Sequence, residues 1–205
     1  MSTDIKGVVF DFGGVVIDWN PMRLYRKVFS GDEVKAENFL ATICTGEWNG
    51  QQDTGYDLMK ATNELVDQYP EWAHEIRAYY GRWIEMIGGP IPGSLEVVQA
   101  LKAAGIRLFG LSNWHCETFA KVRYDYPVFK FFEKIVLSGD HGVIKPDQRL
   151  FRIALDAYGM PAESLVFVDD RPENVEAAKK AGMAGLVFTS AANLKADLKG
   201  LGLAF

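Results

Sequence analysis

Cysteine, histidine and long hydrophobic runs are all scarce in this chain of 205 residues. The two cysteines, Cys44 and Cys116, lie far apart and lack the spacing of a thiolate metal site, so we expect reduced thiols rather than a disulfide. The N-terminal residues place an acid before a short apolar run, a pattern typical of neither a signal peptide nor a membrane span. We therefore expect a cytoplasmic protein with no membrane partner.

Positive charge is scarce as well. The chain has 22 Lys and Arg residues against 27 Asp and Glu residues, a net charge of −5, and its basic residues form no dense patch. This pattern is not that of a nucleic-acid-binding protein, so we expect no nucleic-acid partner. Hydrophobic residues make up 48% of the chain, enough for one packed core with a small appended layer.

Short apolar runs alternate with amphipathic segments over much of the chain. Strands are predicted at residues 8–10, 107–111, 134–137, 165–168 and 185–188. Helices are predicted near residues 94–104, 118–124, 148–158, 172–181 and 192–198. This alternation indicates βα units and therefore an α/β fold, with a Rossmann-like, doubly wound parallel sheet.

The segment from about residue 21 to residue 87 differs, because it has many aromatic residues and no convincing strand. Helical spacing occurs at 56–66 and 72–86, which predicts an inserted α-helical cap. Gly and Pro near the expected joints, around 18–20 and 88–93, suit a hinge. We expect a catalytic core of residues 1–17 plus 89–205 and a cap of residues 18–88. The alternative is one domain with these helices packed on the sheet.

Polar residues follow four of the predicted strands: Asp11, then Ser112 and Asn113, then Lys145, and finally Asp169 and Asp170. Each alone is typical of a turn or a helix cap. Ligands of open α/β sheets, however, bind outside the carboxyl ends of the strands, where all of these side chains are expected to meet. Clustered carboxylates need a neutralising cation, and Mg²⁺ prefers such oxygen ligands.

The segments VVFDFGGVV, LSN, KPD and FVDDRPENVEAA, in this order, resemble the four motifs of the haloacid dehalogenase-like hydrolase superfamily. The resemblance covers essentially the whole chain, because the helical block lies where that superfamily has its first type of cap. Within the superfamily the chain is similar to small bacterial sugar-phosphate phosphatases with an Asp-x-Gly-x-Val first motif.

The resemblance implies hydrolysis of a small phosphorylated metabolite through an aspartyl-phosphate on Asp11. It implies Mg²⁺ bound by Asp11, the carbonyl of Gly13 and Asp170. Ser112 and the amide of Asn113 would bind the phosphoryl oxygens, and Lys145 would neutralise charge. The remaining implied roles concern Asp169, which would position Lys145 or support the metal, and Asn174, which would join the outer metal shell.

One position departs from the family pattern. Phosphatases of the superfamily usually carry a second aspartate two residues after the nucleophile, and this chain has Gly13 there. A missing general acid puts ~10²–10⁴ in rate at stake. Asp18 and His115 are the other candidates, although they read more readily as a turn residue and a helix N-terminal residue.

The cap is expected to select the substrate. Residues 47–49 and 51–53, expected in a loop between helices, offer polar groups beside the ring of Trp48, which suits a sugar or polyol. Trp48 as part of the cap core is the equal alternative. A metal-independent 2-haloacid dehalogenase, a non-catalytic binding protein and a phosphomutase are the rival functions. The sequence does not indicate the oligomeric state.

Overall fold

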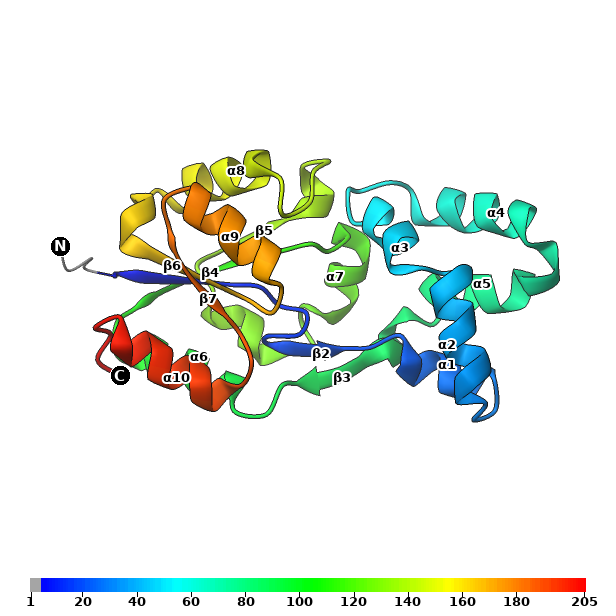
Figure 1. Cartoon of the computed structure of the whole chain (residues 1–205), viewed down its shortest axis with the longest axis horizontal. Coiled ribbons are helices and arrows are strands. Elements are labelled where there is room, and N and C mark those ends of the chain that lie inside the picture. The colour runs from blue at the N-terminus through cyan, green and yellow to red at the C-terminus, as the bar shows by residue number, and fades with distance from the viewer. Residues whose placement is uncertain (1–4) are drawn as a thin grey trace.

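Five parallel strands form the central sheet of the computed structural model, which describes residues 5–205 (Figure 1). Their order across the sheet is β5-β4-β1-β6-β7. The bounds are Gly7–Phe10 for β1, Arg107–Ser112 for β4, Lys134–Leu137 for β5, Leu165–Asp169 for β6 and Ala184–Val187 for β7. Each expected strand is present with its ends shifted by at most one residue, so the predicted α/β fold is confirmed.

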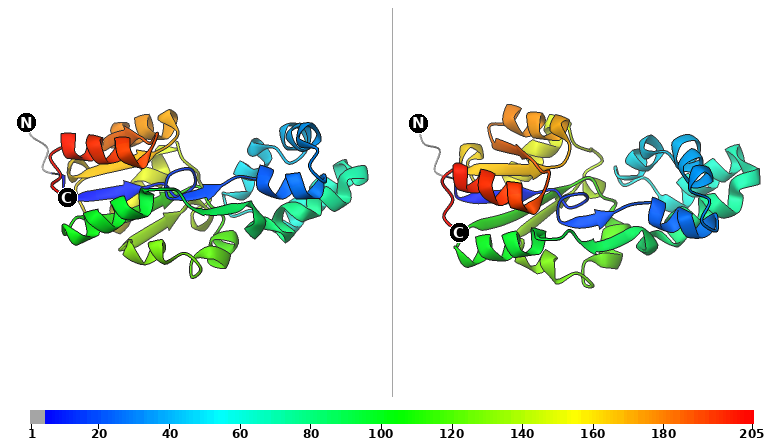
Figure 2. Two further views of the ribbon diagram at one scale, coloured as in Figure 1. Left: turned by 90° about the horizontal axis from the view of Figure 1, so that it is seen from below. Right: turned by 60° about the horizontal axis from the view of Figure 1, so that its bottom comes forward.

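Helices cover both faces of this sheet, which explains why its strands are nearly continuous apolar runs (Figures 1 and 2). On one face Val9, Phe109 and Phe167 pack with residues of α8 (Gln148–Tyr158) and α9 (Pro172–Lys180). On the other face Val8 and Phe10 pack with residues of α6 (Ser94–Ala103) and α10 (Ala191–Gly200). Successive residues of β1 thus bury their side chains on opposite faces.

Strand β1 lies at the point where the strand order reverses. Phe10 is in register with Gly110 of β4 on one side and with Val168 of β6 on the other. Asp11 and Asp169 therefore come next along neighbouring strands, and Ser112 ends β4 at the same edge. The pairing register alone brings three of the predicted site residues to one crevice.

A helical cap extends from this edge of the sheet (Figures 1 and 2). Its helices are α1 (Met22–Val28), α2 (Glu33–Thr42), α3 (Gly46–Gln52), α4 (Leu58–Gln68) and α5 (Ala73–Gly81). Aromatic rings fill its interior, and the ring centroids of Tyr25 and Phe39 lie 4.9 Å apart. Aromatic residues in the inserted segment therefore serve mainly as the core of the cap.

Core and cap are joined by a two-stranded antiparallel ribbon of β2 (Ile17–Trp19) and β3 (Ile87–Pro90). The expected boundaries at residues 17/18 and 88/89 fall inside these strands. The sequence suggested loops here, because both strands have only three or four residues, too few to show a periodicity, and β3 is rich in Gly and Pro. The pairing restricts how the two connections can move relative to each other.

Capping side chains explain where two helices begin relative to the prediction. Helix α7 (Cys116–Val122) begins earlier than expected because Nδ1 of His115 accepts a hydrogen bond from the N–H of Glu117 at 3.2 Å. Helix α4 begins later because Asp57 caps the N–H of Lys60. Short 3₁₀ helices complete the chain: η1 (Pro70–Trp72), η2 (Trp83–Met86), η3 (Pro127–Phe131), η4 (Ser138–Asp140) and η5 (Ala162–Ser164). Within residues 5–205, every helix is too short or too polar to cross a bilayer.

Candidate active site

Asp11 leaves the end of β1 with only 8% of its surface exposed. Its Oδ1 accepts hydrogen bonds from the N–H of Phe12 and from Oγ of Ser112, both at 2.7 Å, and lies 3.1 Å from Nζ of Lys145. Burial raises the pKa of Asp11 to about 6; the Lys145 ammonium opposes the shift, and the Asp169 carboxylate adds to it. Three donors therefore fix one oxygen of a carboxylate at the centre of the crevice.

Lys145 is 2% exposed and reaches the same crevice from the loop that follows β5. Its Nζ donates hydrogen bonds to Oδ2 of Asp169 at 2.7 Å and to the carbonyl oxygen of Leu111 at 2.9 Å. A buried ammonium held between Asp11 and Asp169 is a fixed positive charge for an anionic ligand.

Asn113 fixes the backbone of Lys145. Its Nδ2 donates to the carbonyl oxygen of Lys145 at 3.0 Å, and its Oδ1 accepts from the N–H of Lys145 at 2.7 Å. The side chain of Asn113 thus positions the lysine, a role that the sequence did not suggest, which leaves its backbone N–H as the group expected to bind the phosphoryl oxygens. A carboxamide suits this position because it carries both the donor and the acceptor that the N–H and C=O of Lys145 require.

Asp169 is fully buried and acts as an acceptor for several donors. Besides Lys145, it accepts hydrogen bonds from the N–H of Arg171 at 2.8 Å and from Nδ2 of Asn174 at 3.0 Å. The neighbouring Asp170 is more exposed, and burial followed by the charge of Asp169 raises its pKa. Carboxylate oxygens of Asp11, Asp169 and Asp170 all lie within 4.8 Å of one another.

The glycine turn after Asp11 lies directly against this carboxylate cluster. Gly14 has a φ of +75°, and a Cβ atom there would lie 2.5 Å from Oδ2 of Asp170. A Cβ atom on Gly13 would meet nothing within 4 Å. The two adjacent glycines therefore differ: Gly14 is required by conformation and space, whereas Gly13 leaves open room.

Gly14→Ala is accordingly expected to lower the free energy of unfolding by at least about 1–2 kcal/mol, because alanine in the left-handed region is strained and its methyl group collides with Asp170. Urea denaturation of the two single variants measures this. Gly13→Ala is the matched control and is expected to change stability by less than about 0.5 kcal/mol. Equal losses in the two variants would contradict this description of the turn.

A cavity of about 920 Å³ lies over the carboxylate cluster, between core and cap. The core lines it with Asp11, Gly13, Gly14, Ser112, Asn113, Trp114, Thr118, Ile144, Lys145, Asp170, Arg171 and Asn174, and the connecting ribbon adds Trp19. The cap lines it with Gly46, Glu47, Asn49, Gly50, Gln51, Asp53, Thr54, Tyr80 and Trp83. Five of the predicted strand-end residues, Asp11, Ser112, Asn113, Lys145 and Asp170, thus line one space between core and cap, whereas the fully buried Asp169 does not line it.

Trp48 does not line this cavity among the residues that the structure describes, contrary to its assignment as a substrate-binding residue. Residues 46–52 form helix α3 rather than the expected loop, and the ring of Trp48 packs on Tyr79 and Tyr80 at centroid distances of 5.1 and 5.4 Å. Glu47, Asn49 and Gln51 of the same helix line the cavity, whereas Trp48 packs against the cap core.

The two substitutes considered for the missing acid also point elsewhere. The carboxylate of Asp18 is paired with Arg23, and His115 caps helix α7. Neither residue lines the cavity among residues 5–205. Asp53 does line it, although residues 51–53 were expected only to offer polar groups to the substrate and not to replace the missing acid.

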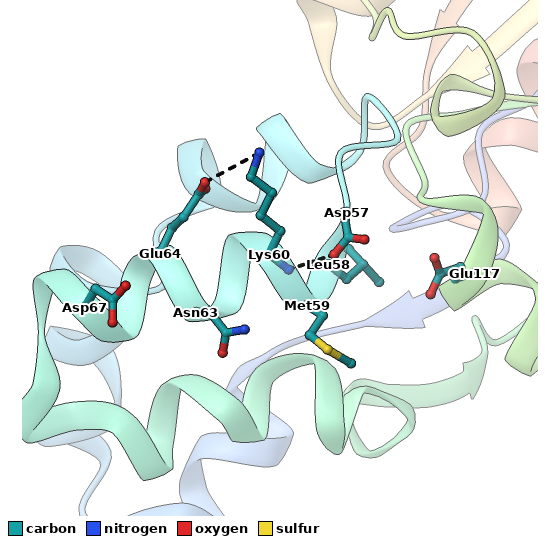
Figure 3. Close-up of a pocket in the computed structure, with 8 residues that line it drawn as sticks. All are labelled: Asp57, Leu58, Met59, Lys60, Asn63, Glu64, Asp67 and Glu117. Atoms are coloured by element: carbon teal, nitrogen blue, oxygen red, sulfur yellow. Dashed lines mark hydrogen bonds and ion pairs between the residues drawn. The ribbon is translucent and has the colours of Figure 1, made fainter.

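A second hollow, of about 680 Å³, lies along helix α4 and faces Glu117 of α7 (Figure 3). Its walls carry the acids Asp57, Glu64 and Asp67. Lys60 is the only basic residue that lines it within the described chain, and its Nζ lies 3.9 Å from Oε1 of Glu64. These charges face solvent and pair locally along the helix. The hollow therefore lacks the convergent buried groups found in the cavity over Asp11.

Two curated relatives align along most of the chain. A sesquiterpene phosphatase of Aspergillus oryzae is 27% identical over 190 residues, covering 92% of this chain and 92% of that protein. A phosphorylated carbohydrates phosphatase of Thermotoga maritima is 22% identical over 182 residues, covering 87% of this chain and 82% of that protein.

The fold is also that of a solved enzyme of the same family. A HAD family enzyme of Bacteroides thetaiotaomicron, solved in complex with magnesium and inorganic phosphate, has a TM-score of 0.67 at 18% identity, covering 91% of this chain and 95% of that chain. The sequence model of the haloacid dehalogenase-like hydrolase family matches residues 5–182 of this chain. With its parallel sheet, its helical cap and the crevice at Asp11, the chain belongs to the haloacid dehalogenase-like hydrolase family.

Proposed function

We propose that the protein hydrolyses phosphate monoesters of small metabolites, with Asp11 as the nucleophile. The observation that carries this proposal is the position of the Asp11 carboxylate, held by Ser112 and Lys145 at the edge of the cavity. A carboxylate so placed can attack phosphorus, forming an acyl-phosphate bond while the bond to the ester oxygen breaks. Water then cleaves the aspartyl-phosphate and regenerates Asp11.

Ser112 and Lys145 would hold the phosphoryl group during this reaction. The hydroxyl of Ser112 and the backbone N–H of Asn113 can donate to phosphoryl oxygens, while Lys145 offsets their charge. Asp169 keeps Lys145 in place through the 2.7 Å ion pair. Catalysis of phosphoryl transfer depends largely on such positioning and charge stabilisation.

The residues around Asp11 fit a bound Mg²⁺ ion. Three carboxylates converge here, and Lys145 supplies one positive charge against them. Oδ1 of Asn174 is buried beside the cluster with no donor among residues 5–205, as expected for an acceptor that faces a hydrated cation. Asp11, Asp170 and the carbonyl of Gly13 would hold the ion, which when bound neutralises charge on the phosphoryl group.

Phosphate release is therefore expected to require Mg²⁺. EDTA should abolish it, added Mg²⁺ should restore it, and Asp170→Asn should raise the Mg²⁺ concentration needed for half-maximal rate by at least about tenfold. Phosphate release titrated against free Mg²⁺ measures the shift, with Asp67→Asn on the exposed face of α4 as the control. Halide release from 2-haloacids that is indifferent to EDTA would instead establish a dehalogenase.

We infer that the organic part of the substrate is a sugar or another polyol. Glu47 and Gln51 bring polar groups to the cavity, and Trp19 and Trp114 form part of its wall. Polar partners beside aromatic rings suit a ligand that carries several hydroxyl groups.

A phosphate-release screen tests both the activity and the substrate class. Sugar phosphates are expected to be hydrolysed with higher kcat/KM than an isoprenoid alkyl phosphate, because an alkyl chain offers no hydrogen-bond partner to Glu47 and Gln51 on the cavity wall. A preference for the isoprenoid ester would contradict the polyol as substrate but would still support phosphatase activity. No phosphate release from any ester with Mg²⁺ present would contradict the phosphatase and favour a non-catalytic binding protein.

A further inference from the structure

Phosphate monoester hydrolysis needs a proton for the departing oxygen, and Gly13 removes the residue that usually supplies it. The position of Gly13 is open, so nothing in the fold fills the space of the missing carboxyl group. Asp18 and His115 are engaged in other contacts, as described above. The proton-transfer group must therefore come from elsewhere on the cavity wall.

Asp53 is a carboxylate that the cap presents to this cavity. It follows helix α3, and its carbonyl oxygen accepts a hydrogen bond from Oγ of Ser138 in the core at 2.5 Å. Two residues later Gly55 lies so close to the core that a Cβ atom there would collide with the carbonyl oxygen of Gly139. The turn that carries Asp53 is thus seated firmly on the core, at the mouth of the crevice.

The side chain of Asp53 is also oriented. Its Oδ2 accepts a hydrogen bond from Nδ2 of Asn49 at 3.1 Å, and Oδ1 of Asn49 accepts one from the hydroxyl group of Tyr80 at 3.0 Å. This chain of contacts runs along the cavity wall, because all three residues line it. A carboxylate held in this way has a defined direction relative to bound substrate.

The environment of Asp53 favours its protonated form. Burial raises the pKa of Asp53 to about 7 and the charge of Asp11 adds to the shift, whereas a hydrogen bond from the backbone N–H of His115 opposes it. The pKa of Tyr80 is in turn raised by burial and, to a lesser degree, by Asp53. A carboxyl group that exchanges its proton near neutral pH suits general acid–base catalysis.

We propose that Asp53, delivered by the cap, is the general acid and base of this active site. The inference rests on the proposed phosphatase function. In the first half-reaction Asp11 bonds to phosphorus, the bond from phosphorus to the ester oxygen breaks, and the Asp53 carboxyl group gives its proton to that oxygen. In the second, the Asp53 carboxylate takes a proton from the water that attacks phosphorus, and Asp11 is released. The site is then complete only when the cap lies on the core.

Two substrates with different leaving groups test this role. Asp53→Asn is expected to lower kcat/KM for a sugar phosphate, whose alkoxide needs a proton, by ~10²–10⁴-fold. The kcat/KM for 4-nitrophenyl phosphate, whose leaving group departs as a stable phenolate, should stay within about threefold, since kcat/KM reports the steps up to leaving-group departure. Asp67→Asn, an exposed cap aspartate, should leave both values unchanged. If the asparagine variant fails to fold, Asp53→Ser replaces it in the same two assays.

If Asp53→Asn lowered kcat/KM equally for both esters, Asp53 would serve only to place the cap on the core, and the proposal would be overturned. The proposal would also be overturned if kcat/KM fell for neither ester. Because the 4-nitrophenyl ester reports Asp11 chemistry alone, wild-type protein that hydrolyses neither ester would contradict the proposed function instead.

A rescue experiment uses the open space at Gly13. Adding Gly13→Asp to the Asp53→Asn variant places a carboxyl group where relatives of this fold carry their acid. The double variant is expected to regain at least about tenfold in kcat/KM for the sugar phosphate, with little change for the aryl ester. If the ratio of kcat/KM for the two esters were the same in the double variant as in Asp53→Asn, the loss in Asp53→Asn would not be a loss of proton transfer.

Discussion

Asp11→Asn is expected to reduce phosphate release by at least about 10⁴-fold, because an amide cannot serve as the nucleophile and the remaining residues of the site cannot replace it. The substitution changes no shape: asparagine can still present an oxygen to Ser112 and Lys145, the two side chains that hold Asp11. Steady-state phosphate release from a sugar phosphate with saturating Mg²⁺ measures the loss. Asp67→Asn provides a matched control on the protein surface and should retain full activity.

The same variant is expected to be at least as stable as the wild type in EDTA. Burial raises the pKa of Asp11 to about 6, so its ionised form is less favourable in the folded protein than in the unfolded chain. Removing that charge also relieves repulsion from Asp169 and Asp170. Urea denaturation measures this. Substantial activity in a well-folded Asp11→Asn protein would contradict the assignment of the nucleophile.

Lys145→Met is expected to lower both activity and stability. The substitution removes a buried ammonium that contacts Asp11 and Asp169, which leaves the fully buried Asp169 without its cation. Breaking a buried ion pair in this way costs about 3–5 kcal/mol in free energy of unfolding. Loss of a preorganised charge at the phosphoryl group is expected to lower kcat by ~10²–10³-fold.

Controls separate these two effects. Lys179→Met removes an exposed lysine whose partner is Glu176, and it should change stability by less than about 0.5 kcal/mol. Adding Asp169→Asn to Lys145→Met should recover part of the lost stability, because the unpaired carboxylate disappears, but no activity. A Lys145→Met protein that unfolds at the same urea concentration as the wild type would contradict the role of Lys145 as a structural cation.

The core of the site could be predicted from sequence because register and strand ends determine it. Once β1 is a buried parallel strand, Asp11 must leave it at the carboxyl edge, and Asp169 must end the neighbouring strand. Lys145 was less certain from strand ends alone, since seven residues separate it from the end of β5, and the family motifs strengthened its assignment. Its exact position depends on the amide of Asn113, a contact that no local pattern indicates.

The cap was predicted less well, since its residues are sorted by tertiary packing. Helical spacing showed that the inserted segment is helical, but not which residues of α3 face the cavity. Trp48 packs inward because Tyr79 and Tyr80 from α5 form the opposite wall, and this depends on where α5 crosses α3. Asp53 was expected only among the polar residues that select the substrate, because an aspartate in a turn is usually solvated; its contact with Ser138 in the core brings it to the site.

Asp11 is expected to carry the phosphoryl group during turnover. Wild-type protein can be mixed with Mg²⁺ and excess 4-nitrophenyl phosphate, quenched with acid within the first turnovers and digested, so that mass spectrometry locates the phosphorylated residue. We expect a phosphoryl adduct on the peptide that contains Asp11, and no adduct in Asp11→Asn. Phosphate released by the wild-type protein without any adduct on Asp11, or with the adduct on another residue, would contradict this role of Asp11.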